Sequence, residues 1–525
     1  MYIAPNTVAR VLKGVRIDNT YNDTIYFASK EAQTNYFASK TKYTFTNLTY
    51  QRKEKRLAVK MCADNMFDCN YLMFQNSGYG NKWFYAFITN VEWVNNETAY
   101  IYFEIDEIQT WFFDFFLDTS FVEREHSATD TVGDNLIPEN LETGEYVSDD
   151  FDGTGKLGSY SYVVAASIDG NGEDATGAIY SGIYSGLRLN VFSTANTLDN
   201  WLHDIPAEKY ESIVSIFMMP TEFVQQNPST GAKTFDIEKT KKVRNIFKTF
   251  TPNNNKIYTY PYNFLYVTNL DGQGSAFPYE YFSTEVCKFG LAGDMSCNPQ
   301  LILYPQNYKG IPANFNEKMT LENFPQCSWT TDAFKAWLAQ TAVPSAIGAI
   351  GSAGISYITG TAGITESYSL GMSGNWASRA DAMNNQAFGF QGNVANSVSS
   401  LLVQGYQKWI QPPQAHGSQA NSAQVAMKIK DFAFMHMHIR EEFAKIIDSY
   451  WDKFGYPVKR VKIPSTHNRP HWNYVKTIGC DAHGSIPASS MSTIKAIHDK
   501  GITYWMNGDE VGNYLLDNRL KGSSE

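Results

Sequence analysis

Residues 336–407 place the strongest constraint on how this chain can fold, because they contain very few charged side chains. Residues 336–365 form a run of thirty residues without a charge, and a second uncharged run covers residues 382–407. Only Glu366, Arg379 and Asp381 separate the two runs. A segment of this kind has to be buried or has to meet an apolar partner, because large exposed apolar patches are rare on soluble monomers.

The apolar residues of this block alternate with Gly, Ser and Thr, so the block lacks the density of a permanent membrane span. Gly348, Gly351 and Gly354 recur every three residues and create a surface on which backbones can approach closely. One interpretation is a segment that is soluble in one state, faces lipid in another and associates with copies of itself. The other is a buried small-residue helix or a flexible Gly/Ala/Ser loop.

The composition of the whole chain favours strands. At 525 residues the chain is too long for one ordinary core, and we expect three or four structural units. Its 33 Tyr, 33 Phe and 11 Trp residues are of types enriched in strands. The net charge of -10 excludes a protein whose whole surface binds nucleic acid tightly.

The cysteines and the N-terminus indicate a chain that is made and folded in a cytoplasm. No CxxC pair occurs, so we expect reduced, mostly buried thiols and neither a disulfide framework nor a zinc site. The first residues lack the charged and apolar regions of a signal peptide. The six cysteines are Cys62, Cys69, Cys287, Cys297, Cys327 and Cys480.

Residues 71–126 have the pattern of an antiparallel meander. Apolar runs at residues 71–74 and 83–88 flank a turn at residues 75–81, and residues 99–106 alternate between apolar and polar side chains. Helical spacing follows for one or two turns from Ile108 to Phe115. Shorter strands are predicted at residues 42–46 and 213–219.

Near the C-terminus the sequence predicts two helices. Apolar residues mark one helix face over residues 443–454, and Gly455 ends that helix. A second helix is expected over residues 490–500, followed by a strand at residues 502–505.

Two groups of short motifs, one near each end of the chain, resemble the tail-knob (distal tail tube) proteins of Picovirinae-type short-tailed phages of Gram-positive bacteria. The resemblance covers roughly residues 10–126 and 430–515. It implies an α+β, mainly antiparallel β fold: a multi-domain, β-barrel-like tube protomer with a long apolar loop insertion. The motifs lie at residues 79–87, 103–106, 109–111, 124–126, 453–456, 460–462, 473–475, 501–503 and 512–514.

The resemblance implies five consecutive parts. Their expected bounds are 1–135 for an N-terminal β tube domain, 136–260 for a second β-rich domain, 261–335 for a third β-rich segment, 336–427 for a hydrophobic plug or membrane-active loop, and 428–525 for a C-terminal α+β domain that completes the tube.

The function implied by the resemblance is that of a structural virion protein without a cofactor. It implies a homo-oligomer, a hexameric ring, at the distal tip of the tail, joined to other phage tail proteins. The ring would be the DNA-ejection conduit, whose apolar loops plug the channel and then penetrate the host cytoplasmic membrane. Its lumen would contact genomic double-stranded DNA transiently.

The residues expected to contact the plug or the membrane all lie in the charge-poor block. Trp and Tyr suit the membrane interface, and the glycines allow close approach. They are Trp337, Leu338, Ile347, Gly348, Ile350, Gly351, Gly354, Ile355, Tyr357 and Ile358, with Trp376, Phe388 and Phe390 as a second apolar arm.

An acidic stretch follows the meander: residues 104–150 contain fourteen acidic residues and one basic residue, Arg124. One interpretation is an ordinary solvated surface. The other is a tube wall that repels DNA, since each Lys or Arg contact to phosphate would add an attachment that moving DNA has to break. The candidates for an acidic lumen are Glu104, Asp106, Glu107, Asp114 and Asp118.

Enzymatic alternatives have weaker support in the sequence. No phosphate-binding loop or HExxH motif is present, and we predict no metal site. His436 and His438 share a strand face but have no third ligand placed by the sequence. Glu104 and Asp106 could imitate a glycosidase pair. A tail-associated peptidoglycan-degrading enzyme and a receptor-binding adhesin therefore remain the alternative functions.

Overall fold

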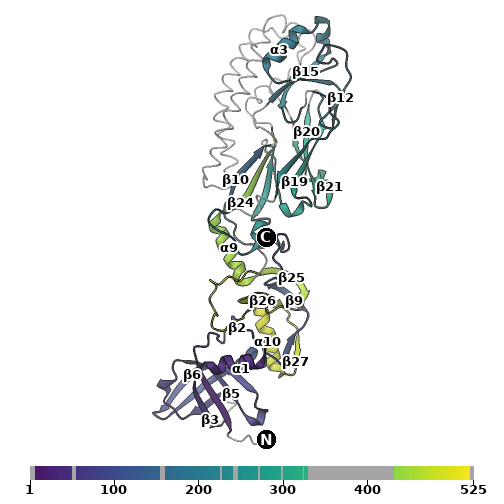
Figure 1. The fold of residues 1–525 in the computed structure, drawn as a ribbon. Helices are drawn as coiled ribbons and strands as arrows, with labels where there is room; N and C mark the ends of the chain where they lie inside the picture. Colours follow the sequence, from purple (N-terminus) through teal and green to yellow (C-terminus); the bar gives the residue numbers. More distant parts are fainter. Residues whose placement is uncertain are drawn as a thin grey trace. The chain divides into compact units, whose positions relative to one another are not determined.

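The computed structural model describes residues 6–49, 55–153, 160–224, 227–239, 246–269, 272–296, 299–322, 324, 326–328 and 431–520. They belong to two compact units, each assembled from segments that are distant in sequence (Figure 1). Unit 1 comprises Met1–Leu141, Thr251–Lys256 and Lys445–Glu525, and unit 2 comprises Glu142–Phe250 and Ile257–Ala444. The division into five consecutive parts stays a prediction.

A six-stranded antiparallel sheet opens unit 1 and confirms the predicted meander. Residues of β5 alternate between two cores: Leu72 and Phe74 enter one, whereas Tyr71 and Met73 enter the other. Both faces of the sheet are therefore covered. In sheet order the strands are β3 (Thr41–Leu48), β1 (Thr7–Lys13), β5 (Cys69–Gln75), β6 (Trp83–Asn95), β7 (Thr98–Ile105) and β4 (Arg56–Val59).

Helix α1 (Lys30–Ser39) packs on this sheet through Phe37, whose ring stacks on Tyr71. The Ser29 hydroxyl accepts a hydrogen bond from the Ala32 amide at 3.1 Å and so caps the helix. The predicted helical turns after the meander are shorter than expected. Helix α2 (Glu107–Trp111) ends early, and Phe115 instead begins β8 (Phe115–Leu117), which pairs with β27 (Ala482–Gly484).

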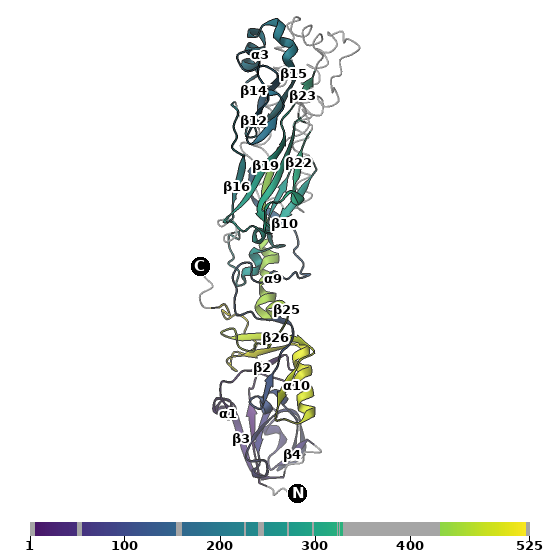
Figure 2. The ribbon, with the colours of Figure 1, turned by 90° about the vertical axis from the view of Figure 1, so that its right-hand side faces the viewer.

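A second sheet of unit 1 joins N-terminal and C-terminal segments (Figure 2). Its strands are antiparallel except for the parallel pair β2–β28. Ile494 and Ile497 of α10 (Ala488–Lys500) pack with Val475 in one core. The strands, in sheet order, are β2 (Asp23–Ile25), β28 (Ile502–Trp505), β26 (Trp472–Ile478), β9 (Ser120–Glu125) and β25 (Tyr456–Lys462).

The described residues of unit 2 form three larger antiparallel sheets and one strand pair. The first has the order β10 (Tyr146–Gly153), β24 (Ala433–Ile439), β17 (Asn263–Thr268), β18 (Gly274–Phe277). The second has the order β14 (Arg188–Phe192), β11 (Tyr160–Ala166), β15 (Ile213–Pro220), β23 (Gln326–Ser328). The third has the order β16 (Thr234–Glu238), β19 (Val286–Asp294), β20 (Gln300–Tyr308), β21 (Ile311–Ala313), with β22 (Met319–Leu321) also on β20.

The remaining elements are a separate strand pair, two α-helices and short 3-10 helices. Strands β12 (Ala178–Tyr180) and β13 (Ile183–Ser185) form the separate pair, and Thr194 caps helix α3 (Ala195–Asp204). Helix α9 (Glu441–Phe454) ends where the sequence predicts. The short 3-10 helices are η1 (Ala63–Asn65), η2 (Ser77–Tyr79), η3 (Ala207–Ser212), η4 (Asn255–Tyr258), η5 (Tyr279–Tyr281) and η6 (Phe315–Glu317).

Gly455 provides a test of how α9 ends. Its φ is 62°, and an added Cβ would lie 2.3 Å from the Glu125 carbonyl oxygen. We expect Gly455→Ala to lower the free energy of unfolding of unit 1 by about 2–4 kcal/mol, because it adds a backbone clash to the left-handed conformation. Denaturant unfolding measures this.

Gly512→Ala is the matched control, because Gly512 also has a positive φ, 83°, but has no atom within 4 Å of an added Cβ. It should cost only about 1 kcal/mol, the conformational part of the effect. Equal losses in the two variants would show that the approach to Glu125 is unimportant.

Candidate functional site

The charge-poor block is joined to unit 2 by a strand on each side. Before it, β23 pairs with β15, with Ser328 opposite Ser215 and Gln326 opposite Phe217. After it, β24 lies between β10 and β17, and all seven of its residues are buried. The two strands that flank the charge-poor block in sequence are therefore both held by backbone hydrogen bonds within unit 2.

The residues predicted to contact the plug or the membrane lie outside the described residues, so their roles stay predictions. Within the described part of the chain, no helix has both the length and the apolar character that a membrane crossing requires. The residues outside it are Trp337, Leu338, Ile347, Gly348, Ile350, Gly351, Gly354, Ile355, Tyr357, Ile358, Trp376, Phe388 and Phe390.

Asp106, one of the five acidic candidates, is buried and caps a helix. It follows β7, and its side chain is 1% exposed. One carboxylate oxygen accepts a hydrogen bond from the Gln109 amide at 3.0 Å and caps α2, and the other accepts from the Tyr71 hydroxyl at 2.9 Å. Burial raises the pKa of Asp106 to about 7. A carboxyl group enclosed in this way cannot line a channel, so this part of the lumen hypothesis needs correction.

The other four acidic candidates reach the surface of unit 1 near α2 and β8. Glu104 is exposed and accepts a hydrogen bond from Asn19 at 3.3 Å, and Glu107 accepts one from the Trp111 indole at 3.0 Å. Asp114 pairs with Lys30 and Lys82, and Asp118 pairs with His483 at 2.6 Å. The two lysines reduce the negative charge around Asp114. Whether the four residues face a lumen stays a prediction.

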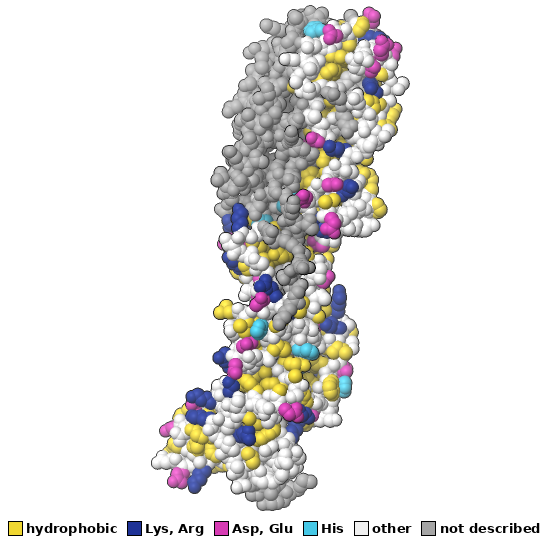
Figure 3. Space-filling model, viewed as in Figure 1, with side chains coloured by type: hydrophobic (Ala, Val, Ile, Leu, Met, Phe, Trp, Pro, Cys, Tyr) yellow, Lys and Arg dark blue, Asp and Glu magenta, His cyan; other side chains and the backbone are white. Residues whose placement is uncertain are grey.

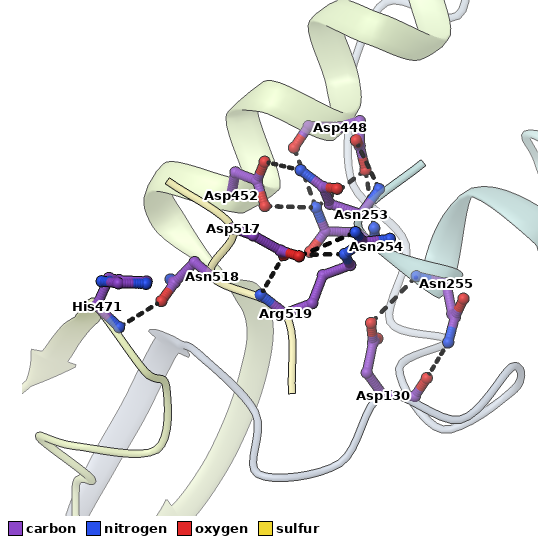
Figure 4. A network of polar contacts seen from close by, with 10 residues as sticks. All are labelled: Asp130, Asn253, Asn254, Asn255, Asp448, Asp452, His471, Asp517, Asn518 and Arg519. Atoms are coloured by element: carbon purple, nitrogen blue, oxygen red, sulfur yellow. Dashed lines mark hydrogen bonds and ion pairs between the residues drawn. The ribbon is translucent and has the colours of Figure 1, made fainter. Parts of the chain in front are cut away.

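A polar network that the sequence did not indicate holds residues 253–255 in unit 1 (Figure 4). The Asp448 carboxylate accepts hydrogen bonds from the backbone amides of Asn253 and Asn254, both at 2.9 Å. The Asn254 side chain donates to Asp448 and Asp452 at 3.0 and 3.2 Å. Charged acceptors of buried amides are worth more than neutral ones, so this contact fixes the segment firmly.

The same network includes the segment before residue 141. The Asp130 carboxylate accepts from the Asn255 amide at 3.2 Å and from the Tyr456 hydroxyl at 2.7 Å. Glu139 forms an ion pair with the buried Lys256 at 2.6 Å and accepts from the Trp451 indole at 2.9 Å. The three sequence segments of unit 1 are thus joined at one place.

Burial sets the ionisation of this network. It raises the pKa of Asp448 to about 6 and raises the pKa of Asp130 and of Asp452. Burial, together with the charges of Arg124 and Lys459, lowers the pKa of Lys256 to about 7. Because each group has a protein partner, the arrangement serves to hold segments together rather than to perform chemistry.

His436 and His438 contact protein groups, and the described cysteines carry free thiols. His436 Nδ1 contacts the Tyr279 hydroxyl at 2.5 Å, and His438 Nδ1 contacts the Ile439 carbonyl at 2.8 Å. Among the described residues, no group of three or more His, Cys, Asp and Glu side chains could hold a metal ion. The described thiols are free, namely those of Cys62, Cys69, Cys287 and Cys480.

The buried Asp106 predicts a pH dependence. A raised carboxyl pKa means that the folded state binds the proton more tightly than the unfolded chain. Its contribution to stability is therefore present below about pH 4 and is lost as the pH rises to about 7. A shift from 3.8 to about 7 corresponds to at most about 4 kcal/mol. Asp106→Asn keeps the cap and should remove this slope from the free energy of unfolding.

Asp64→Asn, at an exposed position of η1, is the control and should leave the profile of the wild type unchanged. Denaturant unfolding at several pH values between 4 and 8 measures both variants. If the profile of Asp106→Asn follows that of the wild type, the carboxyl of Asp106 does not titrate in this range.

Comparisons with known proteins agree with this architecture. Residues 227–519 match the family described as Bacillus phage phi29, Tail knob protein gp9, C-terminal domain. Residues 5–116 match the family described as Caudoviral major tail protein N-terminus.

Whole-chain relatives give the same assignment. The tail knob protein gp9 of Bacillus phage PZA is 27% identical and that of Bacillus phage phi29 is 25% identical, each over 98% of this chain and 99% of the relative. The solved structure of the bacteriophage C1 tail knob protein, gp12, has the same fold, with a TM-score of 0.59 and 13% identity over 98% of this chain and 99% of that one. The chain belongs to the family of phi29-type tail knob proteins.

Proposed function

We propose that six copies of this chain form a ring, that the ring is the distal DNA-ejection conduit of the tail, and that residues 336–427 plug it before they penetrate the host cytoplasmic membrane. The coarser role follows from the family: the chain is a virion tail component that assembles with itself and with other tail proteins. Its relatives are named as tail knob proteins, and it is not an enzyme.

The observation that carries the proposal is the anchoring of the charge-poor block. β23 precedes the block and the buried central strand β24 follows it, both within unit 2, while the thirty residues from 336 to 365 carry no charge. A charge at the centre of a bilayer costs roughly 2.5–3.5 kcal/mol on insertion scales, so a charge-free run avoids the main barrier to insertion. The anchors keep the block attached to the tube throughout.

A ring strengthens this mechanism. Tethered copies raise one another's effective concentration at the membrane, so six weak insertions act as one stronger insertion. In this proposal Trp337 and Tyr357 lie at the membrane interface, and Ile350 and Ile355 lie deeper. Close packing at Gly351 and its neighbouring glycines brings copies together inside the channel.

The acidic surface of unit 1 supports a second part of the proposal, that DNA slides through the lumen without attachment. Glu104, Glu107, Asp114 and Asp118 supply carboxylates where Lys or Arg would bind phosphate. Synthesis in the host cytoplasm and a place at the distal tip of the virion tail complete the proposal.

The membrane step predicts leakage of dye from anionic vesicles by the full chain once the block is released. Ile350→Asp with Ile355→Asp places two charges in the run and should lower leakage at least tenfold. The control, Ile311→Asp with Phe315→Asp, adds the same charge at exposed positions of unit 2 and should leak like the wild type.

Equal leakage by the two double variants would contradict insertion of this segment. Adsorption of the ring to host cells without leakage would favour the receptor-binding adhesin.

The lumen step predicts that added positive charge slows DNA. Glu104→Lys with Asp118→Lys should make the assembled ring retain duplex DNA in a salt-dependent manner, with a slope in log K against log salt of about 0.9 for each phosphate that the new lysines neutralise. Filter binding at several salt concentrations measures this. Asp64→Lys with Glu97→Lys, two exposed positions elsewhere in unit 1, should bind less, and equal binding would mean that Glu104 and Asp118 do not face the channel.

A further inference from the structure

A row of exposed apolar side chains crosses three neighbouring strands of the second sheet of unit 1. Phe121 of β9 lies opposite Val461 of β25 on one side and opposite Ile478 of β26 on the other. Residues directly opposite each other in an antiparallel sheet have side chains on the same face. The three side chains are 36%, 69% and 56% exposed, respectively.

The row breaks the pattern of its own strands. In β26, Val475 and Thr477 are buried, and Lys476 between them points outward and pairs with Glu123 at 2.7 Å. Position 478 should therefore be polar, because alternate residues of a strand face solvent. It is Ile instead, and the outward positions opposite it on β9 and β25 are also apolar. Figure 3 shows hydrophobic side chains at the surface of unit 1 beside charged ones.

A partner can bind to the face of this sheet but not to its edge. β25 is the edge strand, but Lys459 has a φ of 46° and the register shifts between Pro457 and Arg460. Such irregular, charged edges prevent the addition of another strand. A partner can reach the row from above the sheet.

We propose that the row formed by Phe121, Val461 and Ile478 is the apolar centre of the contact between adjacent copies of this chain. This inference rests on the proposed ring and identifies the face of unit 1 that closes it. In a ring each copy presents one face to a different face of its neighbour.

The charges around the row indicate what that neighbouring face carries. Lys459 and Arg460 are exposed beside the row, and in the described part of the chain neither side chain has a hydrogen bond or an ion pair. The chain has a net charge of -10, and Glu97, Glu104 and Asp134 are exposed carboxylates of unit 1. An acidic face of a second copy therefore complements this basic rim. Three side chains are less than the roughly 800 Å² per partner of a stable interface, so they form its centre and polar residues surround them.

The test is the oligomeric state of the full chain. The row variant Phe121→Thr, Val461→Thr, Ile478→Thr keeps β-branched residues in the strands and removes most of the apolar surface. Sedimentation velocity over a range of concentrations should show that it dissociates at a protein concentration at least tenfold higher than the wild type does. The matched control, Phe67→Thr, Trp93→Thr, Val94→Thr, changes three other exposed residues of unit 1 and should sediment as the wild type.

Thermal unfolding shows whether the row variant is still folded, and photo-crosslinking gives a reading that needs no destabilised variant. Benzoylphenylalanine in place of Phe121 should crosslink to a second copy. If the row variant assembles like the wild type, or if the crosslink joins only residues of one chain, the row is not the contact between copies. Either result would leave the proposed ring itself untouched. A wild type that is monomeric at every concentration would overturn the ring itself, and the contact with it.

Discussion

The arrangement of unit 1 depends on the hydrogen bonds that the Asp448 carboxylate accepts from the segment Thr251–Lys256. The chain leaves this unit after Leu141, returns for Thr251–Lys256 and returns again at Lys445. A segment of six residues is too short to form its own core, so specific polar contacts have to hold it in the unit. The Asp448 carboxylate accepts hydrogen bonds from two consecutive backbone amides of this segment. Asp130 accepts a hydrogen bond from the next amide, and Glu139 forms an ion pair with the lysine after it. Buried amides without such acceptors would each cost about 1–3 kcal/mol.

The second sheet also joins segments that are distant in sequence, and it does so through whole strands. Strands β2 and β9 come from the first quarter of the chain, and β25, β26 and β28 come from its last seventy residues. Trp472 and Trp505 are fully buried between them. Both ends of the chain are therefore needed to complete unit 1.

Local signals in the sequence predicted local structure well. The strand at residues 502–505 and the end of α9 at Gly455 follow from apolar alternation and from glycine beyond the last helical turn. The spacing of Phe115 predicts a helix, but its pairing with Gly484, distant in sequence, places it in a strand. The alternation of residues 99–106 predicts a surface position for Asp106, but β7 ends at Ile105 and the Asp106 carboxylate is buried, where it caps α2. The network around Asp448 has no local signature at all, since its partners are separated by more than a hundred residues.

The candidate site could be predicted from the sequence only in part. The absence of charge in residues 336–365 is visible in composition alone, whereas the row of Phe121, Val461 and Ile478 appears only when the neighbours of β9 are known. Electron microscopy of the purified full chain would show the assembly and its channel. We expect rings with a central channel that is closed before contact with a membrane and open afterwards. Single copies, or rings whose channel is open from the start, would contradict this expectation.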